Sequence, residues 1–582
     1  MTDAAISTSR IRRRETPDAS LAELPGELHP VLRRVYAARH VGFDQLRPSL
    51  SDLIPVGRLA GAAPAAQRLI DARDRGERIL ILGDFDADGA TATALCVSCM
   101  RALGFPDVVY VVPNRIEFGY GLSPAIADHA AALKPDLIVT VDNGVSSIEG
   151  VRRARELGID VVVTDHHLPG AQLPDAACIV NPNLADEPFP SKCLAGVGVA
   201  FYLMASVSRM LAERGAVDAS AGRAAVADAL DLVALGTVAD LVPLDFNNRI
   251  LVSEGLARMR AGRTRPGIRA LFDVAGRNLA SARSSDLAFA IAPRLNAAGR
   301  LTDMKTGIEC LLADDAGTAR ALAAQLDRIN VERRELQART ETEARRHVDA
   351  LRAGLDDDHA DAYCLFDAGW HEGVVGLVAS RVKDQVNRPV VAFADADEPG
   401  MLKGSARSVE GIHIRDVLDA VATGHPGLVP KFGGHAMAAG LSLRAEDLGR
   451  FRSAFEAEVS RFAEVLAEPD VIWTDGVLTA DDTQIELAEE LSDAGPWGQG
   501  FPEPVFENRL ELVDCKLLKE RHLKLRVCHP GDSRILDAIA FNQAELPELG
   551  PDASLRVVYR LDVNEFRNRR TAQLVVEHMQ SD

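Results

Sequence analysis

The stretch Ile79-Leu80-Ile81-Leu82-Gly83-Asp84-Phe85-Asp86-Ala87-Asp88-Gly89 decides the fold, because a short apolar run leads directly into alternating aspartates. Such a run predicts a strand buried on both faces, as in a parallel sheet. A helical pattern follows over 91–103. Ligands bind at the carboxyl ends of strands in open α/β sheets, so these aspartates are placed at a candidate site. An EF-hand is excluded, because loop position 12 counted from Asp84 is Leu95 rather than glutamate.

Further apolar runs repeat this pattern downstream. Runs at 108–112, 137–141 and 161–164 are separated by helical patterns, and two of them end in Asp142-Asn143-Gly144 and Asp165-His166-His167. Asp240 follows another apolar stretch, 232–235. We therefore expect a parallel sheet covered on both faces, with these side chains gathered at one of its edges.

Carboxylates and imidazoles in this combination favour Mn²⁺ or Mg²⁺ over structural zinc. A cluster of carboxylates repels itself unless cations are bound, and a two-cation site activates water for phosphodiester hydrolysis. For any single residue a helix cap or a turn is an equally good interpretation. The ordered set together favours the metal site.

The rest of the chain divides by pattern. A long charged segment at about 314–353 suits one exposed helix connecting two lobes. A second α/β unit follows, with strands near 362–366 and 389–393, and short strands from about 470 indicate a small all-β barrel or sandwich. Cys96 and Cys99 form a lone C-x-x-C, which we interpret as buried thiols.

Composition excludes several classes of protein. Of 582 residues, 47% are hydrophobic and 26% charged, which is typical of globular domains. No apolar run approaches the length of a membrane helix, and eight cysteines do not form a disulfide framework, so we expect a cytoplasmic protein without a membrane anchor. The net charge of −20 argues against general coating of nucleic acid but not against one basic groove.

The motifs G-D-F-D-A-D-G, V-D-N-G, T-D-H-H and G-T-V-A-D, in this order, resemble the DHH phosphoesterase superfamily. R-L-N-A-A-G-R (294–300), G-W-H-E-G-V-V-G (369–376), K-G-S-A-R-S (403–408), F-G-G-H-A-M-A-A-G (432–440) and G-Q-G-F-P-E-P (498–504) extend the resemblance from about residue 30 to 580. Within the superfamily the chain is similar to bacterial single-strand-specific exonucleases. The resemblance implies a 5′→3′ exonuclease that hydrolyses single-stranded DNA to mononucleotides in recombination and repair, by two-metal activation of water.

The resemblance also implies a domain order of the α/β class. We expect an N-terminal helical segment (1–75), a DHH-type catalytic domain with a parallel sheet (76–313), a connector helix (314–358), a second α/β, substrate-binding domain (359–465) and an OB-like nucleic-acid-binding β domain (466–582).

The resemblance assigns the metal ligands to Asp84, Asp86, Asp142, His166 and Asp240, with His167 and Asp142 as catalytic residues. It implies two ions, Mn²⁺ or Mg²⁺. Some superfamily members carry an apolar residue where Asp88 stands, so a ligand role for Asp88 stays open. Related pyrophosphatases place a histidine where this chain has Leu80, which predicts weaker binding of the first metal.

Substrate-binding candidates combine arginines, aromatic residues and glycines. An arginine beside an aromatic residue suits a terminal phosphate and a stacked base, and the resemblance places Arg115 and Tyr120 in a 5′-end pocket. Glycines permit close approach of a phosphate, and amides at a helix start bind anions. Arg294 and Arg300 are expected to flank a turn of small residues. The alternative is a loop-anchoring salt bridge for the arginines, a tight turn for the glycine pair and a helix cap for His371. The remaining candidates are Arg294, Asn296, Arg300, His371, Ser405, Arg407, Gly433, Gly434 and His435.

A locally basic stretch, 515–528, and a second cluster at Arg567, Arg569 and Arg570 indicate phosphate contacts in the β domain, with a solvated hairpin as the alternative. Two other functions compete with the exonuclease: a small-substrate DHH enzyme and a non-catalytic DNA-binding scaffold. The resemblance further implies single-stranded DNA, single-strand-binding protein and a helicase as partners, and we expect a monomer.

Overall fold

A computed structural model describes residues 10–113, 121–370, 373–396, 398–434, 436–467, 471–543, 554–566 and 569–581, apart from 353–359. The chain divides into two compact units, one comprising 13–331 with 474–582 and the other 1–12 with 332–473. Among the described residues, no helix is long and apolar enough to cross a membrane.

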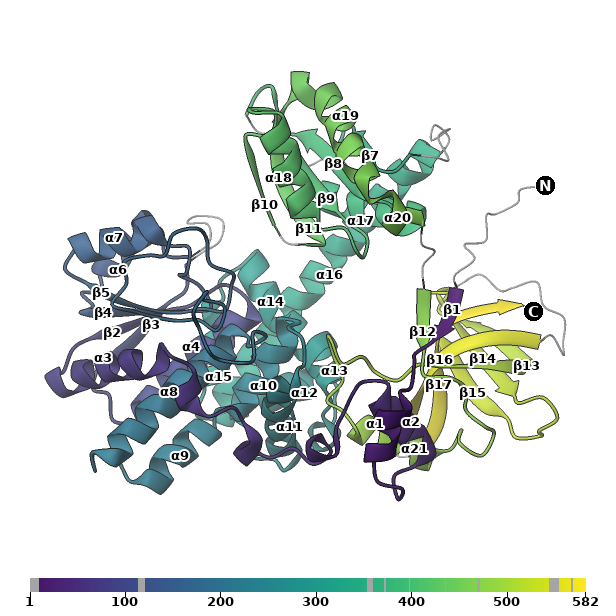
Figure 1. Ribbon diagram of the computed structural model, residues 1–582, viewed down its shortest axis with the longest axis horizontal. Coiled ribbons are helices and arrows are strands. Elements are labelled where there is room, and N and C mark those ends of the chain that lie inside the picture. The colour runs from purple at the N-terminus through teal and green to yellow at the C-terminus, as the bar shows by residue number, and fades with distance from the viewer. Residues whose placement is uncertain are drawn as a thin grey trace. The chain divides into compact units, whose positions relative to one another are not determined.

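The parallel sheet expected around the aspartate motif is present in the first unit. Its strands run in the order β3-β2-β4-β5-β6, and every neighbouring pair is parallel (Figure 1). The strands are β2 (Ile79–Leu82), β3 (Val108–Val111), β4 (Leu137–Val141), β5 (Asp160–Thr164) and β6 (Cys178–Val180).

Helices cover both faces of this sheet, which explains why its strands are continuously apolar. Leu80 and Ile138 pack on the side of α6 (Pro124–Ala131) and α7 (Ile148–Glu156). Ile79 and Val139 lie in the main core on the opposite side, with α3 (Ala62–Arg75), α4 (Ala87–Ala102) and α8 (Gly196–Glu213). Successive strand residues thus enter separate cores. Cys96 and Cys99 are buried in α4, as expected.

A helical region continues from the sheet. The apolar stretch 232–235 belongs to a helix, so Asp240 follows a helix end and not a strand, unlike the other candidate ligands. The helices are α9 (Ala219–Ala227), α10 (Leu230–Ala239), α11 (Phe246–Arg260), α12 (Pro266–Val274), α13 (Ser284–Asp286), α14 (Ala292–Leu301) and α15 (Lys305–Leu312), with the 3-10 helix η4 (Leu279–Ser281) and the π-helix η5 (Leu287–Ile291).

The N-terminal segment is less uniformly helical than expected. It comprises β1 (Arg10–Arg13), α1 (Asp18–Glu23), α2 (Pro30–Ala37) and the 3-10 helices η1 (Phe43–Gln45), η2 (Leu50–Asp52) and η3 (Val56–Arg58) before α3. Arg39 donates two hydrogen bonds to the buried Asp475, at 2.7 and 3.0 Å. This buried ion pair fastens the N-terminal segment to the chain that leads into the β domain.

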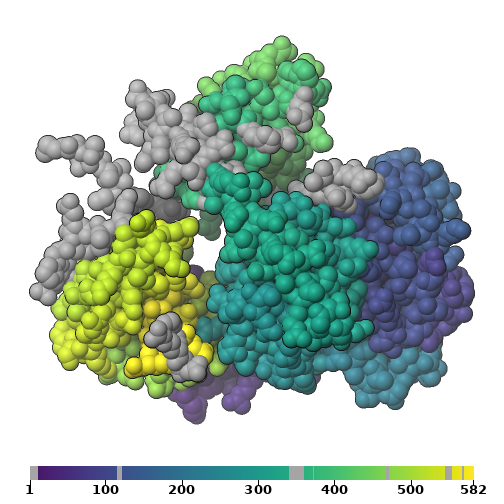
Figure 2. All heavy atoms as spheres, turned by 180° about the vertical axis from the view of Figure 1, so that it is seen from behind, coloured from purple at the N-terminus to yellow at the C-terminus, as the bar shows by residue number. Residues whose placement is uncertain are grey.

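The β domain is a closed barrel with the strand order β13-β14-β15-β17-β16, which decides between the barrel and the sandwich that the pattern left open. Figure 2 shows this domain, in yellow, beside the helices of the same unit. The elements are α21 (Ile485–Asp493), β13 (Phe506–Leu518), β14 (His522–Cys528), β15 (Leu536–Ala540), β16 (Ser554–Phe566) and β17 (Arg569–Ser581).

The second unit contains the other α/β domain and most of the long helix α16 (Ala316–Arg352). Its sheet has the order β10-β11-β9-β8-β7, in which only β7 and β8 are parallel. The elements are β7 (Tyr363–Phe366), α17 (Val375–Val386), β8 (Val390–Asp395), β9 (Met401–Arg407), α18 (Ile414–Gly424), β10 (Lys431–Gly434), β11 (Ala438–Arg444), η6 (Ala445–Asp447), α19 (Leu448–Val459), η7 (Ser460–Phe462), α20 (Ala463–Ala467) and β12 (Val471–Thr474), which pairs with β1.

Candidate metal centre

The loop between β2 and α4 presents the first two aspartates. Asp84 is buried, whereas Asp86 is the N-cap of α4 and accepts the Gly89 N–H at 2.9 Å. The cap interpretation is therefore correct for Asp86, but it engages only one carboxylate oxygen. Asn296 of α14 accepts the Ala87 N–H at 2.7 Å and so fastens the loop from outside.

Asp142 follows β4 and adopts φ = 64°, a left-handed conformation that is uncommon for residues other than glycine. The start of α8 packs against it so closely that a Cβ on Gly196 would lie 2.6 Å from Asp142 Cβ. Any larger residue at 196 would displace this carboxylate. Sequence reasoning missed Gly196, because its role exists only where two distant segments meet.

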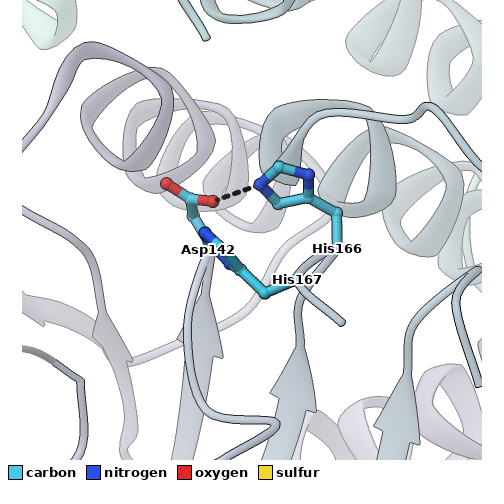
Figure 3. A group of neighbouring side chains, drawn as sticks. All are labelled: Asp142, His166 and His167. Atoms are coloured by element: carbon cyan, nitrogen blue, oxygen red, sulfur yellow. Dashed lines mark ion pairs between the residues drawn. The ribbon is translucent and has the colours of Figure 1, made fainter. Parts of the chain in front are cut away.

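The histidine pair after β5 faces Asp142 (Figure 3). His166 Nε2 lies 3.1 Å from Asp142 Oδ1 and 3.5 Å from Asp240 Oδ2. The His166 and His167 rings are 4.4 Å apart. The structure thus brings together residues from four separate segments.

Asp165 orients both histidines from a buried position. It accepts the N–H groups of Val145, His166 and His167, and its Oδ1 lies 2.7 Å from His167 Nδ1. This contact orients the ring of His167 through its Nδ1 atom. The D-H-H order was the available signal for Asp165, yet sequence reasoning assigned it no role.

The structure shows which groups Asp88 contacts, a residue whose role the sequence left open. Its two carboxylate oxygens accept the N–H groups of Gly196 and Val197, at 2.6 and 2.9 Å, so Asp88 caps the start of α8. Asp88 also lies within the cluster, in a group with His166 and Asp240 whose candidate ligand atoms are all within 4.8 Å of one another. It stabilises the helix that packs against Asp142.

The donor set fits divalent cations. Three overlapping groups satisfy the 4.8 Å spacing, and they are Asp84–Asp86–Asp142, Asp88–His166–Asp240 and Asp142–His166–His167. His166 Nε2 is buried and has no hydrogen-bond partner within the described part of the chain. A neutral imidazole nitrogen among carboxylate oxygens is a donor set suited to Mn²⁺ or Mg²⁺.

Burial and mutual repulsion govern protonation in the metal-free cluster. Burial and then Asp86 raise the pKa of Asp84 to about 7, and burial with Asp88 and Asp86 raises the pKa of Asp240 to about 8. The pKa of Asp142 is raised well above its usual value for the same reasons. Burial lowers the pKa of His166 to about 4, so this ring stays neutral. Burial opposes a charge on His167, but the bond to Asp165 outweighs it and raises the pKa to about 9.

These shifts predict that Mn²⁺ binding releases protons and tightens with pH. Asp84 and Asp240 are ionised only as the pH rises through about 7 and about 8. Because both carboxylates are more acidic when unfolded, the metal-free fold loses stability as the pH rises toward these values. We therefore expect Mn²⁺ to raise the melting temperature more at a pH above 8 than below 7. Calorimetry in buffers of different ionisation enthalpy measures the released protons, and a heat independent of buffer would contradict the prediction.

The arginine motif at 294–300 is a helix, α14, and not a small-residue turn. Arg294 forms an ion pair with Asp327 at 2.8 Å, so the salt-bridge alternative holds for this side chain. Asn296 contacts the metal-site loop as described above, and Arg300 is exposed.

Ser405 and Arg407 share β9 in the second unit. Arg407 donates to Ser405 Oγ at 2.8 Å, and burial lowers its pKa. Gly433 and Gly434 lie in the edge strand β10, opposite Gly440 and Ala439, so the interpretation of this motif as a helix start is wrong. The backbone at Gly434 has φ = 149°, and a Cβ there would lie 2.4 Å from the Ala438 carbonyl oxygen, so glycine is required. Arg115, Tyr120, His371 and His435 lie outside the described residues.

Comparison with known proteins agrees with this geometry. The DHH family, N-terminal domain, matches residues 78–237, the DHHA1 domain matches 360–461 and the RecJ OB domain matches 474–578. The fold and the carboxylate–histidine cluster thus define a DHH-type phosphoesterase.

Comparison with curated relatives identifies the family within this class. The chain is 50% identical to the single-stranded-DNA-specific exonuclease RecJ of Dickeya dadantii and 48% identical to that of Escherichia coli, in each case over 98% of this chain and 99% of the relative. A crystal structure of RecJ from Thermus thermophilus in complex with Mn²⁺ matches with a TM-score of 0.76 and 31% identity, over 98% of this chain and 79% of that one. The chain belongs to the RecJ family of single-stranded-DNA-specific exonucleases.

Proposed function

We propose that this protein is a metal-dependent exonuclease that degrades single-stranded DNA from its 5′ end to mononucleotides. The observation that carries the proposal is the buried cluster of carboxylates around His166, which is suited to divalent cations and lies at the carboxyl ends of a parallel sheet. Relatives at 48–50% identity over nearly the full chain carry the name of single-stranded-DNA-specific exonucleases, which supports the substrate.

In this proposal Asp84, Asp86, Asp142, His166 and Asp240 hold two Mn²⁺ or Mg²⁺ ions. Bound divalent ions supply an activated water and neutralise charge on the phosphate. Asp142 belongs to two of the three donor groups, which supports a bridging role for its carboxylate. We assign His167, whose ring Asp165 orients through Nδ1, to contact with the scissile phosphate.

The substrate contacts are also part of the proposal. Arg115 and Tyr120 recognise the 5′ end, while Ser405, Arg407, His371, Gly433, Gly434 and His435 contact the strand from the second α/β domain. Burial lowers the pKa of Arg407, and a bound phosphate would offset the cost of burying this charge. Arg294 and Asn296 support the metal-site loop and α14, and Arg300 is exposed for contact with the strand.

In this proposal the N-terminal segment (1–75) supports the catalytic domain (76–313), and the connector helix (314–358) leads to the substrate-binding domain (359–465). The β domain (466–582) binds nucleic acid. We further propose a cytoplasmic monomer that acts in recombination and repair, with a helicase supplying single strands and single-strand-binding protein as a partner.

A strand labelled separately at each end tests the function and its direction. With purified protein and Mn²⁺, we expect immediate release of a labelled mononucleotide from the 5′ end, while the 3′ label shortens progressively. First release from the 3′ end would overturn the direction. Cleavage of dinucleotides without digestion of long strands would assign the protein to the small-substrate enzymes, and equal hydrolysis of blunt duplex would remove the single-strand specificity.

A further inference from the structure

A cavity of about 550 Å³ lies within the first unit, where the helical region meets the chain that leads into the barrel. One wall includes Val238 and Leu241 at the end of α10, another Phe289 of η5, and a third Trp497 and Gln499. Its volume is in the range of sites for ligands the size of one or two nucleotides.

Two large apolar side chains of this cavity are exposed to an unusual degree. Phe289 is 81% exposed and Leu241 is 67% exposed. Both also lie on uncommon backbone, since Phe289 is in the middle of a π-helix and Leu241 has φ = 59°. Short π-helices and left-handed bulky residues occur often at functional sites, because they are retained at a cost in stability.

The chemistry of the walls favours a flat, aromatic ligand over a simple anion. Two lining side chains, Arg249 and Trp497, pack on the buried Phe501, which does not itself line the cavity. Arg249 lies 4.3 Å from the centre of the Phe501 ring, and Trp497 stacks on it at 4.9 Å. The charged side chains that line the cavity are balanced, with Arg249, Arg260 and Arg283 against Glu254, Asp493 and Glu503. A cavity without net charge, with an exposed aromatic ring at its edge, suits the face of a nucleobase.

The position of the cavity connects it to the metal centre. The helix α10, which forms one wall, is followed directly by Asp240, and η5 packs against α10. After η5 comes α14, whose Asn296 holds the metal-site loop. On the other side, residues 495–499 lead into β13 of the barrel.

We infer that this cavity receives a nucleobase of the single strand on its way between the barrel and the metal centre, with Phe289 as the stacking residue. The inference rests on the proposed function and adds to it a base-binding site outside the metal centre. Stacking on an aromatic side chain tolerates any base, so the site contributes affinity for long strands without sequence preference.

Phe289→Ala tests the inference, and its exposure means that the fold loses little packing. In the absence of divalent metal, we expect the affinity for a long oligothymidylate, measured by fluorescence anisotropy, to fall roughly 5- to 100-fold. With Mn²⁺, KM for the long strand rises while turnover of a dinucleotide stays at the wild-type level. Phe289→Trp keeps a stacking surface and restores the affinity, whereas Phe289→Leu does not.

Phe366→Ala removes a phenylalanine that is 37% exposed on β7 of the other unit and is the matched control. An affinity of Phe289→Ala equal to that of the control, or restoration by leucine, would overturn the stacking role. A wild-type protein that hydrolyses no single strand would instead refute the proposed function.

Discussion

Asp142→Asn is expected to lower the turnover of single-stranded DNA by about 10³-fold or more, while making the metal-free protein more stable. The activity falls because Asp142 belongs to two of the three donor groups, and an amide is a poor bridging ligand. The metal-free fold gains stability because burial and neighbouring aspartates raise the pKa of Asp142, so its ionised form opposes folding. Thermal unfolding in EDTA at alkaline pH, together with Mn²⁺-dependent hydrolysis, measures both effects.

Asp231→Asn is the matched control, since Asp231 is equally buried but forms an ion pair with Arg265 at 3.0 Å. Here the same substitution removes a stabilising partner and leaves a partly buried arginine without its carboxylate. We expect a lower melting temperature and near-normal turnover at permissive temperature. A gain in stability for Asp142→Asn together with a loss for Asp231→Asn would identify Asp142 as a functional carboxylate. A destabilised Asp142→Asn with normal turnover would mark it as structural.

Asp165→Asn is expected to reduce kcat by about 100-fold or more, because it disturbs both histidines. The carboxylate accepts three backbone N–H groups and contacts His167 Nδ1 at 2.7 Å, and an amide reproduces neither the charge nor all of these bonds. Single-turnover kinetics at saturating Mn²⁺ separates this loss from weaker metal binding.

A double-mutant cycle decides whether Asp165 acts through His167. If it does, Asp165→Asn combined with His167→Ala is no slower than His167→Ala alone. Additive losses would show that Asp165 acts by another route, such as the backbone of His166. Thermal unfolding of each variant shows whether a loss of activity comes from a loss of fold or from misplaced histidines.

The order of the motifs predicted most of the catalytic fold and of the candidate metal centre. Continuous apolar runs at 79–82 and 137–141 predict buried parallel strands, because only a sheet covered on both faces buries successive side chains. An aspartate after each strand is then carried to the same sheet edge by topology alone. The short alternating strands likewise predicted an all-β domain, and the structure shows that it is a closed barrel and not a sandwich.

The local sequence pattern did not predict the role of a residue that has more than one possible partner. Arg294 resembled a phosphate ligand, but the helix places it beside Asp327. The glycines at 433 and 434 fitted a helix start, yet pairing with β11 makes them an edge strand. Asp327 is 33 residues from Arg294 and becomes its neighbour only through folding, whereas the glycines pair with residues a few positions further along the chain.

By itself, then, the sequence determined which residue types reach the edge of the sheet, because strand period and chain order are local properties. Only the tertiary structure decided what each of them does there. Asp88 turned out to cap α8, Asp165 to orient His167, and Gly196 to leave room for Asp142. The same holds for the cavity beside Phe289, whose walls come from segments more than 200 residues apart. Distances across such gaps are set by packing, which no local pattern records.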